Sequence, residues 1–511
     1  FNLSGIGMDD IRQQYHPMIV HHSQQLSDME VVTVGTASCA PSTTRGVSCT
    51  AIRFGKSSRD EGERNKEEGE KKEKKKAAAN HERFLSEYST RDLASQQIRT
   101  YPPKDMMETF GKFQAGIWLF DCGECTQLQV QRTSHVRPSK ITKIFLTHCH
   151  GDHTFGLPGL LCQMGQSRSR DSPPIQIYGP EGVRMWLRTA MRYTASRITP
   201  NYIVHELKNV PVAPEWMRAN NGKYFRKKGY DETRNSWAMR QDDPLSWVSA
   251  CRNIKFPSDR NFGEIGDGRD IYPQYEHPSC VDGAPIWEVE DEGDIMVHAA
   301  PMSHGVPCVG YVIKEPSRQG RLRPELVEPI IKRNAAALRE SGMAHPMKVM
   351  AKIKNLPDGG IYTFPDGTEV NQKDVLEEPR KGRKIVVCGD TADCRAIEDL
   401  AKNADVLIHE ATNAFIPGFD SGTSPIKVEE ETKLHGHSTP HMAAKFAKRI
   451  GAKRLLLNHF SARYSGDQSF DSIVKMTTIE KQAIESSGLD ENNVAATWDF
   501  MVLPVPFNTE A

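Results

Sequence analysis

The chain has 511 residues, 38% of them hydrophobic, so it is long enough to bury a sizeable core and to form more than one domain. Its 66 basic and 66 acidic residues cancel, and a neutral total does not exclude a nucleic-acid partner, because a local basic patch can attract a polyanion. The 11 cysteines lack framework spacing, which indicates a reducing intracellular compartment rather than a disulfide scaffold. No apolar run is long enough to cross a membrane, so we expect no membrane partner.

Two strands are expected near the amino terminus, over Met29–Gly35 and Val47–Phe54. The loop that joins them is rich in small and turn-forming residues, and its Arg45 is a candidate phosphate contact. A plain hairpin loop is the alternative. The chain begins with a residue other than Met, which leaves room for an upstream targeting segment, and Phe1–Asp28 has no apolar signal core.

A highly charged segment interrupts the pattern after the second strand. In Lys56–Lys76, 16 of 21 residues are charged and none is apolar, so the segment cannot bury enough surface to offset its ordering entropy. We interpret 56–103 as a solvated, disordered insertion between two strands of one domain. A role for its lysines in binding nucleic acid is the alternative.

The next strand is predicted at Gly116–Asp121, followed directly by Cys122-Gly-Glu-Cys125. A single CxxC without a second one cannot complete a four-cysteine metal site. We therefore interpret it as a tight turn rather than as a metal or redox site.

A cluster of metal-type ligands follows the predicted buried strand Ile141–Thr147. Sheets of the α/β class usually place their ligands at the carboxyl ends of strands, and Gly151 allows the chain to turn tightly there. A lone histidine is more often a core or surface residue than a ligand, but this pattern places four ligand-type side chains within six residues: His148, His150, Asp152 and His153. The sequence therefore predicts a metal site.

Helices and strands then alternate, as expected for an α/β layered core: helix His153–Met164, strand Pro174–Tyr178 and helix Pro180–Ala195. A second, polar insertion is expected over residues 208–290. It holds four of the seven tryptophans: Trp216, Trp237, Trp247 and Trp287. These rings could stack on bases or cap a partner surface, but we favour a role in anchoring a loop-rich subdomain.

Four further strands end in ligand-type or acid–base residues, which unrelated core residues seldom do: Asp294–Ala300 before His304, Lys384–Cys388 before Asp390, Asp405–Ile408 before His409-Glu410, and Arg454–Leu457 before His459. Two more histidines, His435 and His437, precede a helix predicted over Met442–Gly451. Ser438 or Thr439 is its expected N-cap.

Residues 314–383 lie between two ligand-bearing strands, where a short connection would suffice. A helix is predicted over Pro324–Ser341. Met347–Lys354 is interpreted as an extended approach to a hairpin, because two Pro-Asp-Gly turns flank Ile361–Phe364. Three lysines at even spacing would line one face of that extended strand: Lys348, Lys352 and Lys354. An ordinary surface hairpin with solvated lysines is the alternative.

The motif His148-Cys-His-Gly-Asp-His153 resembles the H-x-H-x-D-H signature of the metallo-β-lactamase superfamily. The longer run Leu146–Leu161 resembles one branch, the ribonuclease Z (tRNA 3′-processing endoribonuclease) family. Further motifs match that family in order along the chain: Pro41, Thr43 and Arg45 in the first loop, Asp121–Thr126, His304 with Gly310-Tyr311, Gly389-Asp390-Thr391, His409–Thr412 and His437-Ser-Thr439. Two positions depart from the family pattern, Gly46 in place of Asn and Cys125 in place of a small residue.

The resemblance implies an αββα metallo-β-lactamase sandwich over 29–505, with two insertions and a protruding arm at 314–383 that holds tRNA. It also implies two zinc ions per subunit, about 3.5–4 Å apart, which can hold a hydroxide and stabilise an attacked phosphate. The implied ligands are His148, His150 and His304 for one ion, Asp152, His153 and His459 for the other, and Asp390 as the bridge. The implied general base is Asp152, and Glu410 with His437 is the pair that protonates the leaving oxygen.

The resulting hypothesis is a zinc-dependent endoribonuclease that removes 3′ trailers from precursor tRNA, with a homodimer as the expected assembly. Another hydrolase of the same fold, acting on a small phosphodiester, ester or thioester, is the first alternative. A non-catalytic tRNA-binding scaffold is the second. The acid–base pair favours RNA, because a ribose hydroxyl is a poor leaving group that needs a proton. The sequence does not choose among cytosol, nucleus and organelle.

Overall fold

The computed structural model describes residues 29–55, 116–169, 171–218, 224–229, 259–266, 268–291, 295–317, 319–467 and 469–507. The insertion predicted at 56–103 lies outside these residues, as do Trp237 and Trp247. The chain divides into two compact units, the first from Phe1–Lys314 and Lys384–Pro506 and the second from Glu315–Arg383 and Phe507–Ala511. Among the helices in the described ranges, none is both long and apolar enough to cross a membrane.

The first unit contains a nine-stranded mixed sheet, in which β3, β4, β5 and β6 run parallel. In spatial order its strands are β10 (Asp270–Ile271), β6 (Tyr202–Leu207), β5 (Ile175–Pro180), β4 (Ile141–Phe145), β3 (Ile117–Phe120), β2 (Cys49–Phe54), β1 (Met29–Gly35) and β20 (Val502–Pro504), with β9 (Glu264–Gly266) also paired to β6. The carboxyl end of β4, where the predicted metal motif begins, therefore lies near the middle of this sheet.

A second sheet of seven strands carries the other predicted site residues. In spatial order it consists of β11 (Trp287–Asp291), β12 (Met296–Pro301), β13 (Val309–Lys314), β16 (Lys384–Val387), β17 (Val406–Glu410), β18 (Leu455–Asn458) and β19 (Val494–Ala496). The last four run parallel, so their carboxyl ends meet at one edge of the sheet.

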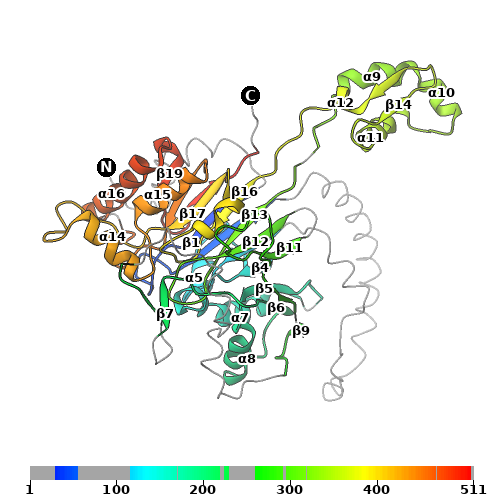
Figure 1. Cartoon of the computed structure of the whole chain (residues 1–511). Coiled ribbons are helices and arrows are strands. Elements are labelled where there is room, and N and C mark those ends of the chain that lie inside the picture. The colour runs from blue at the N-terminus through cyan, green and yellow to red at the C-terminus, as the bar shows by residue number, and fades with distance from the viewer. Residues whose placement is uncertain are drawn as a thin grey trace, which may run out of the picture. The chain divides into compact units, whose positions relative to one another are not determined.

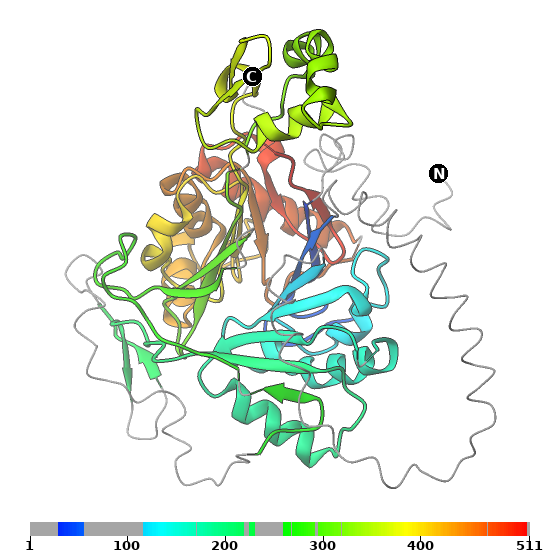
Figure 2. The ribbon, with the colours of Figure 1, turned by 90° about the vertical axis from the view of Figure 1, so that its right-hand side faces the viewer.

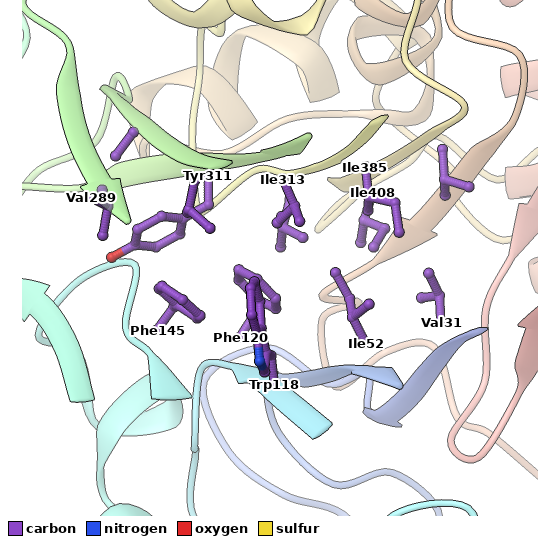
Figure 3. Packing of buried hydrophobic residues seen from close by; sticks show 14 of the residues in the cluster. Val31, Ile52, Trp118, Phe120, Phe145, Val289, Tyr311, Ile313, Ile385 and Ile408 are labelled. Atoms are coloured by element: carbon purple, nitrogen blue, oxygen red, sulfur yellow. The ribbon is translucent and has the colours of Figure 1, made fainter. Parts of the chain in front are cut away.

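Apolar side chains from both sheets fill the space between them. Figure 3 shows Phe120 and Phe145 pointing from the first sheet toward Tyr311 of the second. The Phe120 and Phe145 rings stack with centroids 5.0 Å apart, and Tyr311 meets Phe145 edge-on at 5.4 Å. Burying three aromatic side chains in one layer makes a large contribution to the apolar area removed from water. This layer holds the two sheets face to face.

Helices cover the outer face of each sheet (Figures 1 and 2). Helices α7 (Leu157–Ser167) and α8 (Val183–Tyr193) bury leucines and methionines against the first sheet, with the short α5 (Thr126–Gln129) nearby. Helices α15 (Pro440–Arg449) and α16 (Phe470–Ser487), with α13 (Glu398–Ala401), cover the second sheet. The order helix, sheet, sheet, helix confirms the predicted αββα sandwich.

Local expectations differ from the structure mainly at element boundaries. The predicted helix at His153–Met164 is two helices, α6 (Gly151–Thr154) and α7, and the strand expected from Val47 begins at Cys49. Thr439 is the N-cap of α15, since its side chain accepts a hydrogen bond from the backbone N–H of Met442. Described parts of 208–290 supply β9, β10 and β11 to the sheet edges, besides a hairpin of β7 (Trp216–Arg218) and β8 (Tyr224–Arg226).

The second unit has its own small core. Helices α9 (Pro324–Arg333), α10 (Ala335–Glu340), α11 (Val349–Lys354) and α12 (Gln372–Val375) pack with a hairpin of β14 (Ile361–Thr363) and β15 (Glu369–Asn371), as Figure 1 shows. The predicted hairpin is confirmed. The predicted extended strand at Met347–Lys354 is wrong: Val349 and Ile353, four residues apart, are both buried in the core, a spacing that suits a helix.

Candidate metal and acid–base site

The loops at the carboxyl ends of the strands bring the predicted ligands together. His148 and His150 follow β4, Asp152 and His153 lie in α6, and the second sheet supplies His304 after β12, Asp390 after β16 and His459 after β18. Their ligand atoms form two close groups. The first contains His148, His150, His304 and Asp390, and the second Asp152, His153 and His459.

Three imidazole nitrogens of the first group face one another. The Nε2 atom of His148 lies 3.0 Å from Nδ1 of His150, and Nε2 of His304 lies 3.3 Å from the same His150 atom. Tetrahedral zinc with Zn–N bonds of about 2.0–2.1 Å requires neighbouring nitrogens about 3.3 Å apart. The three nitrogens therefore have the spacing of ligands around one ion.

The second group has the same character and is joined to the first through Asp390. The Nε2 atoms of His153 and His459 are 3.2 Å apart, and Oδ2 of Asp152 lies 3.5 and 3.3 Å from them. Asp390 directs Oδ1 toward this pair, at 3.5 and 3.4 Å, and Oδ2 toward Nε2 of His148, at 3.8 Å. One carboxylate thus presents one oxygen to each group.

Each ligand histidine has one ring nitrogen that faces the ligand group and one that faces away from it, and the contact of the outer nitrogen leaves the inner one free to bind a metal ion. In four of the five histidines the outer Nδ1 contacts a protein oxygen: Thr147 Oγ1 for His148, Asp121 Oδ2 for His153, the Gly436 carbonyl for His304 and Thr412 Oγ1 for His459. His150 is the exception, since its Nδ1 faces inward. A neutral imidazole that donates from Nδ1 presents a bare lone pair at Nε2. Such converging lone pairs repel unless a cation lies between them. Burial lowers the pKa of His153, but the carboxylates of Asp390 and Asp121 raise it well above its usual value, which shows how strongly this group attracts positive charge. The residues present therefore fit a zinc pair.

Burial favours the neutral form in the first group. It lowers the pKa of His148 and of His150, and it lowers the pKa of His304 to about 4. These imidazoles therefore carry no proton at neutral pH that a metal ion would have to displace.

Glu410 and His437 form a hydrogen-bonded pair beside these groups. Nδ1 of His437 lies 3.1 Å from Oε1 of Glu410, which also accepts a hydrogen bond from the backbone N–H of Thr391 at 2.6 Å. Burial by itself lowers the pKa of His437, but the adjacent Glu410 carboxylate raises that pKa to about 9. His437 is therefore protonated at neutral pH, and its side chain remains 16% exposed. It can deliver a proton to a bound molecule.

Asp121 orients two of the histidines, a role that we had not predicted. Its Oδ2 lies 2.7 Å from Nδ1 of His153, and its carboxylate accepts hydrogen bonds from the backbone and hydroxyl of Thr147, whose hydroxyl contacts His148. The residue also has φ of 63°, a left-handed conformation that is uncommon outside glycine. A carboxylate that ends a buried strand next to the motif strand was the available signal.

Trp216 of the second predicted insertion packs against the first ligand group. Its side chain is 3% exposed, and its ring centroid lies 6.4 Å from that of His304. Gly436 lies between them with φ of 81°, and a Cβ there would be 2.7 Å from His304 Nδ1 and 2.9 Å from the Trp216 ring. Trp216 and the fully buried Trp287 are therefore packing residues, but they do not anchor a separate loop-rich subdomain as we favoured: Trp287 lies in the main core, and Trp216 holds His304 in place.

Comparisons with known proteins identify the family. The Beta-lactamase superfamily domain matches residues 118–220. Zinc phosphodiesterase ELAC protein 1 of Bos taurus is 35% identical over 401 residues, which cover 76% of this chain and 90% of that protein. Ribonuclease Z of Bacillus velezensis is 31% identical over 392 residues, covering 76% and 89%. The chain belongs to the ribonuclease Z family.

A solved structure, human short-form tRNase Z, aligns over 93% of this chain and 99% of its own with 23% identity and a TM-score of 0.46, so the assignment rests on the sequence relatives. In this ribonuclease Z chain, the family motifs quoted above supply the Glu410–His437 pair and every member of the two ligand groups except His459, which follows the buried strand β18. The family motifs also include Arg45, which lies elsewhere.

Arg45 lies in the interior rather than at the surface. Its side chain is 3% exposed, and its guanidinium donates to the carbonyls of Tyr464 at 3.0 Å and Thr497 at 3.1 Å. It also donates at 2.6 Å to the Thr36 hydroxyl, which in turn donates to Asp499. A side chain this deeply buried cannot reach a phosphate at the surface, so the predicted phosphate contact of Arg45 is not supported. Arg45 instead ties the first loop of this ribonuclease Z to the carboxyl-terminal strands.

The three candidate lysines of the second unit lie on or beside a helix. Lys348 and Lys352 are exposed and four residues apart, so they share one face, whereas Lys354 is half-buried. Within the described residues none of the three ammonium groups has a carboxylate partner, and residues 341–357 contain no Asp or Glu. The lysines therefore form a local basic patch in this ribonuclease Z, on a helix rather than on the predicted strand.

Replacing Arg45 by alanine tests the structural role. We expect Arg45→Ala to lower the free energy of unfolding by about 2–4 kcal/mol, because the buried carbonyls of Tyr464 and Thr497 and the Thr36 hydroxyl lose their donor. Chemical denaturation measures this loss, with the exposed Arg137→Ala as the control. The salt dependence of tRNA binding should stay unchanged. If the variant is stable and the log–log salt slope of its tRNA binding falls by about 1, Arg45 is a phosphate contact after all.

Proposed function

We propose that this ribonuclease Z chain is a zinc-dependent endoribonuclease that removes 3′ trailers from precursor tRNA. The observation that carries the proposal is the pairing of two ligand groups through Asp390, with the protonated His437 beside them. Curated relatives named zinc phosphodiesterase and ribonuclease Z, similar over most of the chain, support the same activity.

Two zinc ions per subunit are proposed, one for each ligand group with Asp390 between them. A bound zinc pair supplies an activated water and stabilises charge on an attacked phosphate. Asp152 accepts the proton of the attacking water, and its Oδ2 is held in place by the backbone N–H of Cys39 at 2.7 Å. Glu410 is 1% exposed and keeps the His437 ring oriented.

His437 protonates the oxygen that leaves the phosphate. Its Nδ1 is engaged by Glu410, so its Nε2 is the nitrogen that can reach the leaving group. A ribose oxygen is a poor leaving group, and general acid catalysis typically contributes 10²–10⁴-fold in such a case. A thioester or lactam hydrolase has less need of this proton, which favours RNA over the other substrates of the same fold.

The substrate contact proposed outside the centre is the basic patch of Lys348, Lys352 and Lys354, in the segment 314–383 that we propose as the tRNA-binding arm. A homodimer is also proposed as the assembly. A non-catalytic tRNA-binding scaffold is disfavoured, because such a protein has no need of two ligand groups and an acid–base pair.

The deciding experiment is cleavage of a 3′-extended tRNA by the purified chain loaded with zinc. The expected product is a trimmed tRNA with release of the trailer, detected on a denaturing gel. Turnover of a small phosphodiester without cleavage of the tRNA would favour the small-substrate hydrolase. Binding of the tRNA without cleavage would favour the scaffold.

Asp152→Ala should lower turnover at least about 100-fold, because the residue is both a ligand and the proposed base. Binding of tRNA should remain nearly intact, since Asp152 makes no phosphate contact in this proposal. Single-turnover cleavage and a filter-binding assay measure the two quantities, with the exposed Asp171→Ala as the matched control. Normal cleavage by a folded Asp152→Ala enzyme would refute the assignment.

Glu410→Ala and His437→Ala should each slow RNA cleavage strongly, and the double variant should be little worse than either single one, because paired groups act as a unit. The loss should shrink for a substrate that releases nitrophenolate, which leaves without a proton. His435→Ala is the matched control, since this exposed histidine lies two residues from His437. Multiplicative losses, or equal losses on both substrates, would contradict the proton-donor role.

The arm is tested by removing charge, because replacing the whole segment would delete the core residues Val349, Ile353 and Val370. Replacing Lys348, Lys352 and Lys354 together by glutamine should weaken precursor-tRNA binding and lower its log–log salt slope by about 1 for each lost phosphate contact. Hydrolysis of a small phosphodiester should be unchanged. Lys332→Gln is the control, since that lysine already pairs with Glu328 at 2.7 Å. An unchanged salt slope would remove the arm's proposed role.

A further inference from the structure

We propose that Cys388, Cys394 and His409 form a separate binding site for a thiophilic metal ion such as Zn²⁺ or Cu⁺. Their ligand atoms all lie within 4.8 Å of one another, and all three side chains are buried. The two thiols and the imidazole belong to the face of the second sheet that α15 and α16 cover. Soft sulfur ligands favour these ions.

The hydrogen bonding of His409 prepares it to bind a metal. Its Nδ1 lies 2.8 Å from the carbonyl oxygen of Glu410, so Nδ1 carries a proton and Nε2 is the ring nitrogen turned toward the thiols. That Nε2 lies 3.0 Å from the sulfur of Cys394. Zinc bonded to both would hold them about 3.5 Å apart, so an opening of roughly 0.5 Å admits the ion.

A cavity of about 330 Å³ reaches this cluster. Cys394 and His409 line it, together with Ser438, Met442, Lys433 and Lys445. Three protein ligands with a cavity beside them leave a fourth coordination position open to solvent, as in zinc sites that exchange a ligand. The ion displaces the two thiol protons to solvent as it binds, and no oxidation or reduction takes place.

The same loop joins this cluster to the proposed catalytic site. Cys388 and Cys394 flank Asp390, which faces both ligand groups, and His409 directly precedes Glu410. The backbone N–H of Thr391 binds Glu410 at 2.6 Å within that loop. An ion that moves the Cys394 sulfur and the His409 ring apart therefore shifts Asp390 and Glu410, and the site acts as a metal-sensing control on turnover.

Cobalt(II) added to the metal-free full chain tests the site, because only a thiolate ligand gives a sulfur-to-cobalt charge-transfer band. The proposed catalytic ligands contain no cysteine, so the band reports this cluster separately from RNA cleavage. We expect the band in the wild type, its loss in Cys388→Ser and Cys394→Ser, and its persistence in Cys149→Ser, which removes the thiol of the histidine motif. Absence of the band, its survival in the first two variants, or its loss in Cys149→Ser overturns the proposal.

The band is a better measure than the total metal count, because His277, Glu288 and His298 also lie within ligand distance of one another. X-ray absorption of the zinc-loaded wild type requires no variant, and we expect sulfur neighbours at about 2.3 Å. A spectrum with only nitrogen and oxygen neighbours would overturn the site even if the serine variants failed to fold.

Coupling to turnover is measured with a small phosphodiester and the chain loaded with only two zinc ions per subunit, which leaves the thiol site free. Added Cu⁺ or excess Zn²⁺ should slow the wild type at least about tenfold, since sub-ångström displacement of positioned groups is costly. The response should disappear in Cys394→Ser. Equal inhibition of both proteins would show that the ion acts elsewhere and would overturn the control role.

Discussion

The hydrogen bond from the Tyr311 hydroxyl to the carbonyl oxygen of Leu146, 2.7 Å long, sets the relation between the two sheets on which the site depends. Tyr311 belongs to β13 of the second sheet, and Leu146 lies two residues before His148 of the first. The Tyr311 ring is fully buried against Phe145, so the bond lies inside the apolar layer and is shielded from water. The two groups of ligands come from both sheets, and this layer determines their separation.

Backbone strain accompanies the ligand geometry. Asp121 and His459 both have positive φ, 63° and 58°, a conformation that costs about 1–3 kcal/mol for residues other than glycine. In Asp121 the positive φ places the carboxylate against Nδ1 of His153. In His459 it turns Nε2 toward the second ligand group while Nδ1 contacts the Thr412 hydroxyl at 2.9 Å. Thr412 also donates to Glu410, so the ligand and the proton-donor pair share one hydroxyl. Ligand position and proton delivery are therefore mechanically linked.

The loop between Cys388 and Cys394 also carries residues of two different sites. Asp390 within this segment turns toward the two ligand groups, while the flanking cysteines turn into the opposite, helix-covered face of the sheet. Strand β16 ends at Val387, so Cys388, Asp390 and Cys394 lie in the loop that follows, where residues two apart no longer have to share one face. One short loop thus connects a hard histidine–carboxylate centre to a soft thiol cluster.

The sequence by itself determined most strands and predicted which residues would meet in the two ligand groups and in the Glu410–His437 pair, because those signals are local: His148 to His153 span six residues, and apolar runs mark each strand before its ligand. Only the tertiary structure decided which residues support them. Arg45 turns inward because the carbonyls of Tyr464 and Thr497, from the far end of the chain, accept its hydrogen bonds, and Trp216 reaches His304 through an insertion whose sequence has no clear periodicity. The helix at Val349–Lys354 did have a local signal, because the apolar residues Val349 and Ile353 are four residues apart. We interpreted the even spacing of the lysines as a strand and missed it. Contacts between distant residues depend on how apolar layers pack, and that packing leaves no pattern in a local stretch of sequence.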